Sequence, residues 1–198
     1  MYSQELKEKI TFITELEKLK VVYRQNGVTD GSRAENSAEH SWHIAIMAIL
    51  LHEHAISPAL NLLKVIKMLL IHDIVEIDAG DTFLYDEKRK KEAIEAEKNA
   101  AIRIFGLLPL KHGEEFMALW MEFEAKTTPE AQYAASIDAI QPLLNHLVTA
   151  KRHENPNQMT KSAVLKKKAF IQDISPELWV VAQDIIEKSV DNGLYTKD

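Results

Sequence analysis

The dipeptide His72-Asp73 is the strongest chemical signal in this chain. It ends the apolar run from Leu62 to Ile71, and Glu76 follows one helical turn later. Imidazole nitrogens and carboxylate oxygens bind divalent cations, and a further carboxylate on the same helix face can transfer a proton. This short stretch therefore indicates a metal-dependent hydrolase.

Two more side chains of the same chemical kinds support the dipeptide, which alone could arise by chance. His40 stands near the start of one apolar-periodic segment, and Asp138 stands inside another, between Ile137 and Ala139. An ionised carboxylate in apolar surroundings is costly unless a cation or strong hydrogen-bond donors compensate it. Two histidines and two aspartates from three helices can therefore converge on one ion.

Helices must position these groups, because helix-start signals are frequent and strand signals are nearly absent. Three dipeptides pair an N-cap residue with proline at the first helical position: Ser57-Pro58, Thr128-Pro129 and Ser175-Pro176. Further starts are predicted at Asn36 or Ser37 and at Asp86. The periodicity predicts an all-α fold with helices over 3–20, 37–55, 58–76, 87–105, 110–125, 129–152, 161–171 and 176–191.

Two segments rich in glycine and aspartate are predicted to be loops beside the candidate site. Gly27 to Asn36 leads into the helix that carries His40, and Asp78 to Thr82 follows the His-Asp helix. Both loops are expected to border one pocket.

The composition indicates one folded, soluble domain spanning residues 1–198. The chain is 46% hydrophobic and 27% charged, and its formal net charge of -6 disfavours a nucleic-acid polymer or an anionic membrane as partner. It contains no cysteine, so any metal must be bound by nitrogen and oxygen atoms. The N-terminus lacks a signal-peptide pattern and no stretch is long enough to span a bilayer, so the expected location is cytoplasmic.

Several other polar or aromatic groups favour structural interpretations. The runs Lys88 to Lys91 and Lys166-Lys167-Lys168 are typical of solvated helix faces. His43 is predicted to be a buried or rim residue, and the side chains of His52-Glu53-His54 diverge on a helix. Trp120 and Phe123 are predicted to be core or interface residues.

The order of the candidate ligands resembles the HD-domain metal-dependent phosphohydrolases, in which a histidine is followed by His-Asp and then by a distant aspartate. Ala38-Glu39-His40, His72 to Glu76, Gly80-Asp81 and Asp138 are similar in order and spacing to the branch that contains bacterial 5′-deoxynucleotidases. The resemblance covers residues 15–150. It implies an HD-domain helical bundle, here with additional C-terminal helices.

The resemblance also implies roles for individual residues. It assigns four ligands to one divalent ion, which could be Mn, Co, Fe, Ni, Zn or Mg: His40, His72, Asp73 and Asp138. Glu76 corresponds to the acid/base carboxylate and Asp81 to a water-orienting or supporting group. Arg24 corresponds to the arginine that binds the substrate phosphate, and Arg33 is an alternative contact. The aromatic segment that usually follows this arginine is replaced by Gln25 to Val28, which leaves recognition of the base and sugar open.

The expected activity is hydrolysis of a phosphomonoester, with a nucleoside 5′-monophosphate as the expected substrate. One alternative is a cyclic-nucleotide or guanosine-tetraphosphate hydrolase on the same scaffold. Another is a non-catalytic helical interaction protein with a structural metal, although Glu76, Asp81 and Arg24 favour catalysis.

The segment after Lys151 lies outside the resemblance. It carries apolar residues that are expected partly to cover the core and partly to form a homodimer interface: Val164, Phe170, Trp179, Val180 and Ile185.

Overall fold

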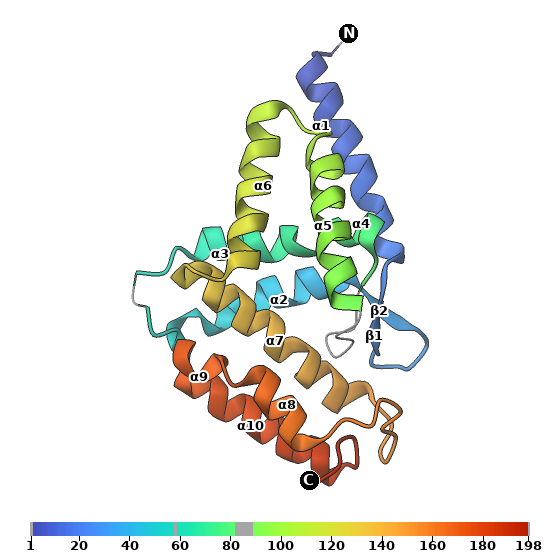
Figure 1. Ribbon diagram of the computed structural model, residues 1–198, viewed down its shortest axis with the longest axis vertical. Helices are drawn as coiled ribbons and strands as arrows, with labels where there is room; N and C mark the ends of the chain where they lie inside the picture. The colour runs from blue at the N-terminus through green and yellow to red at the C-terminus, as the bar shows by residue number, and fades with distance from the viewer. Residues whose placement is uncertain (1, 58, 82–88, 198) are drawn as a thin grey trace.

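The described part of the chain is mostly helical, so the predicted all-α fold is confirmed (Figure 1). The computed structural model describes residues 2–57, 59–81 and 89–197, with the side chains of 89–92 excepted. The α-helices are α1 Gln4–Glu15, α2 Ser37–Leu51, α3 Leu62–Ile71, α4 Glu76–Ala79, α5 Arg89–Phe105, α6 Leu110–Ala125, α7 Pro129–Thr149, α8 Lys161–Lys168, α9 Ile171–Ile174 and α10 Pro176–Asp191. Three 3-10 segments join them: Leu16–Val21, His52–His54 and His72–Val75.

Helix α7 is the centre of the bundle. It contacts α2, α3, α6 and α10, while α1, α5 and α6 stand at one end of the molecule and α8, α9 and α10 lie at the other (Figure 1). One cluster of buried apolar side chains runs through the molecule and includes Val164, Leu178 and Ile186. The C-terminal helices therefore cover part of the core, as expected. None of the described helices is both long and apolar enough to cross a membrane.

Side-chain caps explain where the central helices begin. Thr128 and Ser175 accept hydrogen bonds from the first turns of α7 and α10, and proline follows each of them, as predicted. Asn36 and Glu39 form a capping box at the start of α2, which places His40 in its first turn.

Two predicted helix starts need comment. The start at Ser57-Pro58 is wrong: Pro58 lies outside the described residues, but residues 59–61 are not helical and α3 begins at Leu62. Asn61 is the effective cap, because its side chain accepts from the backbone of Lys64. The predicted start at Asp86 lies outside the described residues, and α5 is described from Arg89.

A small β-hairpin corrects the prediction that residues 27–36 are entirely a loop, in a chain whose strand signals are nearly absent. Strand β1 (Tyr23–Gly27) pairs antiparallel with β2 (Ala34–Asn36), with an irregular register between Tyr23 and Gly27. The pattern was missed because Tyr-Arg-Gln-Asn-Gly has no alternation of apolar and polar residues. Instead, the exposure of the side chains alternates along β1, and the polar residues Arg24 and Asn26 are the more buried ones. Asn26 donates a hydrogen bond to the carbonyl oxygen of Pro142 in α7.

The His-Asp dipeptide does not belong to an α-helix, which corrects the predicted continuous helix over 58–76. The α-helical part ends at Ile71, and His72–Val75 forms a tighter 3-10 turn before α4 begins at Glu76. Side chains spaced by three residues eclipse one another in a 3-10 segment. The side chains of His72–Val75 therefore leave the backbone in directions that differ from those in the α-helix predicted for this stretch.

Candidate metal centre and active site

His40, His72 and Asp73 form a buried group that could hold a metal ion, called the His-Asp cluster below. Each offers one ligand atom, and these atoms all lie within 4.8 Å of one another. His40 comes from α2, whereas His72 and Asp73 come from the 3-10 turn after α3. The sequence-predicted ligands from two separate segments are therefore brought together.

Asp138 in α7 adjoins the His-Asp cluster. Its Oδ1 atom lies 2.9 Å from Nε2 of His40 and 3.7 Å from Nε2 of His72. Pro142 lies inside α7 and has no N–H to donate to the backbone carbonyl of Asp138 one turn earlier, so that carbonyl lacks its usual helical hydrogen bond. With 31% of its side chain exposed, against 9% for Asp73, Asp138 marks the more open side of the cluster.

The spacing between the ligand atoms of His72 and Asp73 fits a divalent ion. Ligands at about 2.1 Å from an ion are about 3.0 Å apart in octahedral geometry and about 3.4 Å apart in tetrahedral geometry. Asp73 Oδ1 is 2.9 Å from His72 Nε2, and Asp73 Oδ2 is 3.9 Å from His40 Nε2. Despite the short distance to Asp73 Oδ1, Nε2 of His72 forms no hydrogen bond and is buried. A buried imidazole nitrogen without a hydrogen-bond partner, beside carboxylates, belongs to the donor set of a nitrogen–oxygen metal site.

The electrostatics of the metal-free protein agree with this interpretation. Burial acts to lower the pKa of His72, but the Asp73 and Asp138 carboxylates outweigh it and raise that pKa. Burial acts to raise the pKa of Asp138, but His40 and His72 hold it well below its usual range. Protons shared among these groups would be released when a divalent cation takes their place.

The orientation of His72 is set by two contacts. Its Nδ1 lies 3.0 Å from the carbonyl oxygen of Leu69, which fixes Nδ1 as the protonated nitrogen when the ring is neutral. The ring of Phe123 packs 4.8 Å away, centroid to centroid, and Phe123 is 3% exposed. The prediction that Trp120 and Phe123 are core residues is confirmed.

His40 is oriented by a buried amide that the sequence reading missed. Its Nδ1 lies 3.0 Å from Oε1 of Gln141, and Nε2 of Gln141 donates to Oε1 of Glu35 at 2.9 Å. An ionised Glu35 carboxylate can only accept a hydrogen bond, so the NH₂ group of Gln141 faces Glu35 and its oxygen faces Nδ1 of His40. The other ring nitrogen of His40, Nε2, then points to the His-Asp cluster and can bind an ion there. The available signal was the position of Gln141, three residues after Asp138 on the same helix face.

Arg24 lies against the His-Asp cluster, on strand β1. Its Nη1 atom is 3.1 Å from Oδ2 of Asp73 and 3.7 Å from Oδ1 of Asp81, and its Nε atom is 3.8 Å from Oε2 of Glu35. Burial opposes the charge of Arg24, but the surrounding carboxylates, Asp73 first, raise its pKa. A permanently charged guanidinium is therefore held beside the candidate metal ligands.

Glu76 and Asp81 are the other acids near Arg24. Burial, followed by the neighbouring Asp73 charge, raises the pKa of Glu76 to about 9, and the hydroxyl of Ser37 lies 2.6 Å from its Oε2. Burial also raises the pKa of Asp81. A protonated carboxyl can donate a hydrogen bond or a proton at neutral pH, whereas an ordinary glutamate cannot.

Comparison with known proteins now identifies the family. Residues 16–179 match the sequence model of the HD domain family. The chain belongs to this family. The resemblance inferred from His40, His72-Asp73 and Asp138 is thereby confirmed.

Solved structures and curated relatives agree with the HD-domain assignment. A crystal structure from Magnetospirillum magnetotacticum MS-1, named a predicted metal-dependent phosphohydrolase, is 43% identical with a TM-score of 0.89, covering 98% of this chain and 100% of that one. The 5′-deoxynucleotidase HDDC2 of Dictyostelium discoideum is 32% identical over 132 residues, which are 64% of this chain and 70% of that protein. The Danio rerio protein of the same name is 28% identical over 110 residues, which are 56% of this chain and 53% of the relative. The matched stretch thus spans about half of the latter relative.

Arg33 is not brought to the HD-domain site. Its side chain is 45% exposed and forms an ion pair with Glu39 on α2. That pairing positions the capping box at the start of α2. Direct contact of Arg33 with a bound phosphate therefore has no support in this arrangement.

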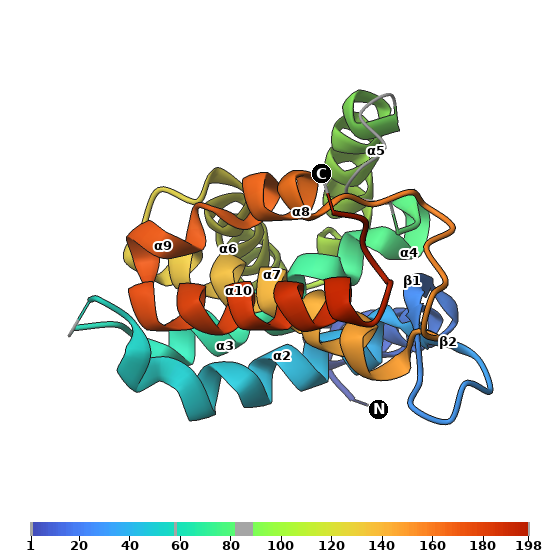
Figure 2. The ribbon, with the colours of Figure 1, turned by 90° about the horizontal axis from the view of Figure 1, so that it is seen from below.

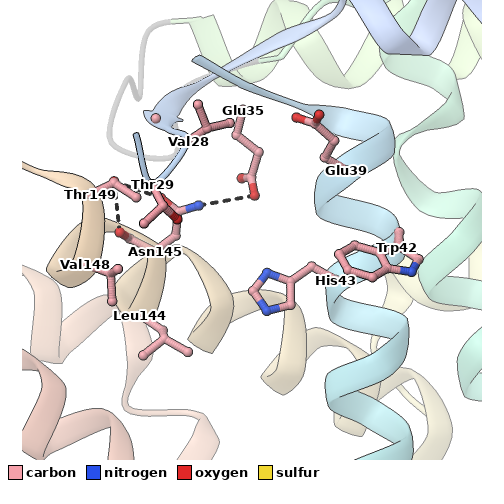
Figure 3. A pocket seen from close by; sticks show the side chains of 11 residues that line it. Val28, Thr29, Glu35, Glu39, Trp42, His43, Leu144, Asn145, Val148 and Thr149 are labelled. Carbon is pink, nitrogen blue, oxygen red and sulfur yellow. Dashed lines mark hydrogen bonds between the residues drawn. The ribbon is translucent and has the colours of Figure 1, made fainter. Parts of the chain in front are cut away.

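A pocket of about 390 Å³ lies between the hairpin, α2 and α7 (Figure 3). Glu35 and Asn145 line it and are joined by a hydrogen bond, and His43 and Trp42 line it from α2. His43 Nδ1 is 3.3 Å from Nε2 of Gln141, which agrees with the predicted rim position.

The two predicted loops do not border this pocket together. Residues 27–29 line it, but none of Asp78–Asp81 does, so the expectation of one pocket between the two loops is not met here. Thr82 lies outside the described residues.

Lys168 corrects the prediction that Lys166-Lys167-Lys168 is a solvated run. Only 5% of Lys168 is exposed, whereas Lys166 is exposed. The reason is helical phase: Lys168 follows Val164 by four residues, and Val164 is fully buried against the core. The side chains in the other predicted basic run, Lys88 to Lys91, lie outside the described part.

Proposed function

We propose that this HD-domain protein is a metal-dependent phosphohydrolase that releases phosphate from a nucleoside 5′-monophosphate. The observation that carries the proposal is the position of Arg24, whose guanidinium lies 3.1 Å from a carboxylate of the His-Asp cluster. A guanidinium beside the metal ligands can bind a phosphate whose oxygen also contacts the ion, which is what a phosphate-binding site needs. The names of the relatives, metal-dependent phosphohydrolase and 5′-deoxynucleotidase, support the same activity.

His40, His72, Asp73 and Asp138 would hold the divalent ion. When bound, such an ion supplies Lewis-acid chemistry and lowers the pKa of water. Arg24 would bind two oxygens of the phosphate through its planar fork and so orient phosphorus towards the attacking water. Asp81, held near Arg24, would orient this water or steady the guanidinium.

Glu76 is proposed as the acid/base group. Burial raises the pKa of its carboxyl above the ordinary value, and a carboxyl with a raised pKa is suited to delivering a proton to the leaving nucleoside oxygen. The Ser37 hydroxyl, 2.6 Å away, holds the carboxyl in place. Protonation makes the departing nucleoside a neutral alcohol, which lowers the barrier to cleavage.

A substrate screen tests the proposal. The protein is stripped with a chelator, reloaded separately with Mn, Co, Fe, Ni, Zn or Mg, and assayed for phosphate release from ribo- and deoxynucleoside 5′-monophosphates. We expect release that requires metal and leaves the nucleoside as the other product. Hydrolysis confined to cyclic nucleotides or guanosine tetraphosphate would replace the proposed substrate. Retained metal with no hydrolysis of any of these compounds would reject catalysis in favour of a structural ion.

The buried amide of Gln141 gives a prediction about metal affinity. Gln141→Leu removes the group that accepts from or orients Nδ1 of His40, while roughly keeping side-chain volume. Such partners of metal-bound histidines typically contribute about 10- to 100-fold in affinity. We therefore expect a loss in this range by competition with a chelating dye. Gln132→Leu, on the same helix but away from His40, is the control and should bind metal normally.

Homodimer formation and a cytoplasmic location are further proposals. Of the apolar residues considered after Lys151, Val164 and Ile185 are buried, but Phe170 is 38% and Val180 63% exposed. Exposed apolar side chains on the C-terminal helices support a self-association surface there. The absence of cysteine supports a reducing compartment.

A further inference from the structure

The pocket between the hairpin, α2 and α7 is a cavity that the proposed phosphate chemistry does not use. Figure 2 shows the hairpin beside the last turns of α7 and the start of α2, and side chains from these elements line the cavity. Its volume of about 390 Å³ falls within the range of small-molecule sites, about 300 to 1,000 Å³. The described residues that line it include neither Arg24 nor any candidate metal ligand. The pocket is therefore separate from the proposed phosphate site.

His40 connects this pocket to the candidate metal centre. Nε2 of its ring lies 2.9 Å from Asp138 beside the His-Asp cluster, whereas Nδ1 lies 3.0 Å from the amide oxygen of Gln141. The nitrogen of that amide donates to Oε1 of Glu35 and lies 3.3 Å from Nδ1 of His43. Glu35 and His43 both line the pocket. A single side chain, that of Gln141, thus links the pocket wall to a candidate metal ligand.

The polar and aromatic groups of the pocket indicate which ligand chemistry it suits. Asn145 donates to Oε1 of Glu35 at 3.2 Å, while Oε2 of Glu35 is buried and accepts no hydrogen bond (Figure 3). From α2, the rings of Trp42 and His43 lie 6.1 Å apart, centroid to centroid, and 65% of Trp42 is exposed. A carboxylate with an unfilled acceptor favours an N–H donor, and an exposed indole offers a face on which a flat ring can stack.

The charge of the pocket disfavours an anionic ligand. Glu35 and Glu39 line it, and no lysine or arginine is among the described residues that do so. Aliphatic side chains complete the lining: Val28, Leu144 and Val148. A phosphate would meet carboxylates without a compensating cation. An uncharged heterocycle that carries an amino group fits the carboxylate, the indole and the aliphatic wall together.

We propose that this pocket binds an uncharged aminopurine nucleoside, with its amino group at Glu35 and its purine ring on Trp42, and that this binding tightens the metal site through Gln141. The choice of a nucleoside rests on the proposed function, because hydrolysis of a nucleoside 5′-monophosphate releases one. A ligand that fixes Glu35 also fixes the Gln141 amide, which orients His40 for metal binding. Nucleoside concentration would then influence how much of the protein carries its metal.

Adenosine is the probe that tests the pocket in the metal-free protein, where no turnover is needed. Calorimetry compares the wild type with Trp42→Ala and with the control Leu50→Ala, which removes a similarly exposed apolar side chain from α2 outside the pocket. We expect Trp42→Ala to weaken adenosine binding about 10-fold or more, because stacking of a base on an aromatic ring is lost. Leu50→Ala should leave the affinity unchanged. Purine riboside, which lacks the amino group, should bind about 10-fold more weakly than adenosine because it cannot donate to Glu35.

Val148→Arg is a second variant, which places a bulky side chain in the pocket from an exposed position of α7. It should abolish adenosine binding while circular dichroism shows normal helices. Affinity that is unchanged in both Trp42→Ala and Val148→Arg would place adenosine elsewhere and overturn the site. A wild-type protein that binds no adenosine would overturn it as well.

Competition with a chelating dye, with and without saturating adenosine, measures the coupling to the metal site. We expect adenosine to raise the metal affinity of the wild type about 5-fold or more, and the metal to raise adenosine affinity by the same factor. Gln141→Leu should bind adenosine but lose this coupling. Equal metal affinity with and without adenosine in the wild type would overturn the coupling.

The outcomes also separate the pocket from the proposed function. Adenosine bound in the pocket of a protein that hydrolyses no nucleotide would reject the nucleotidase activity and leave the nucleoside site standing. Hydrolysis of nucleotides by a protein that binds no adenosine in this pocket would overturn the nucleoside site while the enzyme stands.

Discussion

Asp73→Ala is expected to lose both the bound metal and all measurable phosphohydrolase activity. Asp73 offers one oxygen 2.9 Å from His72 Nε2 and another 3.1 Å from Nη1 of Arg24. The substitution therefore removes an anionic ligand and also the carboxylate that holds the phosphate-binding arginine. Metal affinity in such sites depends on deprotonated ligands and their charge, so the two remaining neutral imidazoles and Asp138 should not retain the ion.

Metal content after gel filtration, measured by elemental analysis, is the direct readout for Asp73→Ala. Asp184→Ala is a matched control, because Asp184 is an exposed residue of α10 whose described ion pair is with Lys188 on the surface. The control should keep both metal and activity. Circular dichroism must show that Asp73→Ala retains its helices. A variant that is folded and carries the wild-type amount of metal would remove Asp73 from the ligand set.

Glu76→Ala is expected to lose about 10²-fold or more in kcat while it retains the metal, because general acid/base groups usually contribute 10²- to 10⁴-fold. Glu76 lies outside the His-Asp cluster, so its loss leaves the ligand atoms in place. Steady-state kinetics and metal content are measured together on the best nucleotide. Glu114→Ala, at an exposed glutamate of α6, should be unaffected. Near-normal turnover by metal-loaded Glu76→Ala would exclude the proposed proton transfer.

A stability measurement distinguishes this role of Glu76 from a structural one. The pKa of Glu76 rises from its ordinary 4.5 to about 9 on folding of the metal-free protein. A raised carboxyl pKa contributes stability at low pH, and this contribution is lost as pH rises from about 4.5 to about 9. Metal-free Glu76→Gln does not titrate, so we expect its unfolding temperature to exceed that of the wild type at pH 8, by more than at pH 5. A lower unfolding temperature at pH 8 would indicate that the Glu76 carboxylate stabilises the fold.

The amino-acid sequence determined the chemical inventory of the site and most of the helices. Two histidines and two aspartates in apolar segments specify a nitrogen–oxygen metal site in a chain without cysteine. Caps such as Thr128 and Ser175 act on the backbone of the next turn, so the starts of α7 and α10 could be predicted locally. The same local logic failed at Ser57-Pro58, because an equally suitable cap, Asn61, stands a few residues later.

Only the tertiary structure decided which groups support and complete the site. Gln141 contacts His40 and Glu35 across sequence separations of 101 and 106 residues, and Arg24 reaches Asp73 across 49. Helix phase places Lys168 on the same face as Val164, but only the packing of that face against the core decides that Lys168 is buried while Lys166 is exposed. The hairpin likewise exists because Arg24 and Asn26 turn towards partners on other elements, not because its residues favour strands. Residue types and short spacings specify backbone conformation and possible chemistry, whereas burial and partners depend on elements that meet only after the chain has folded.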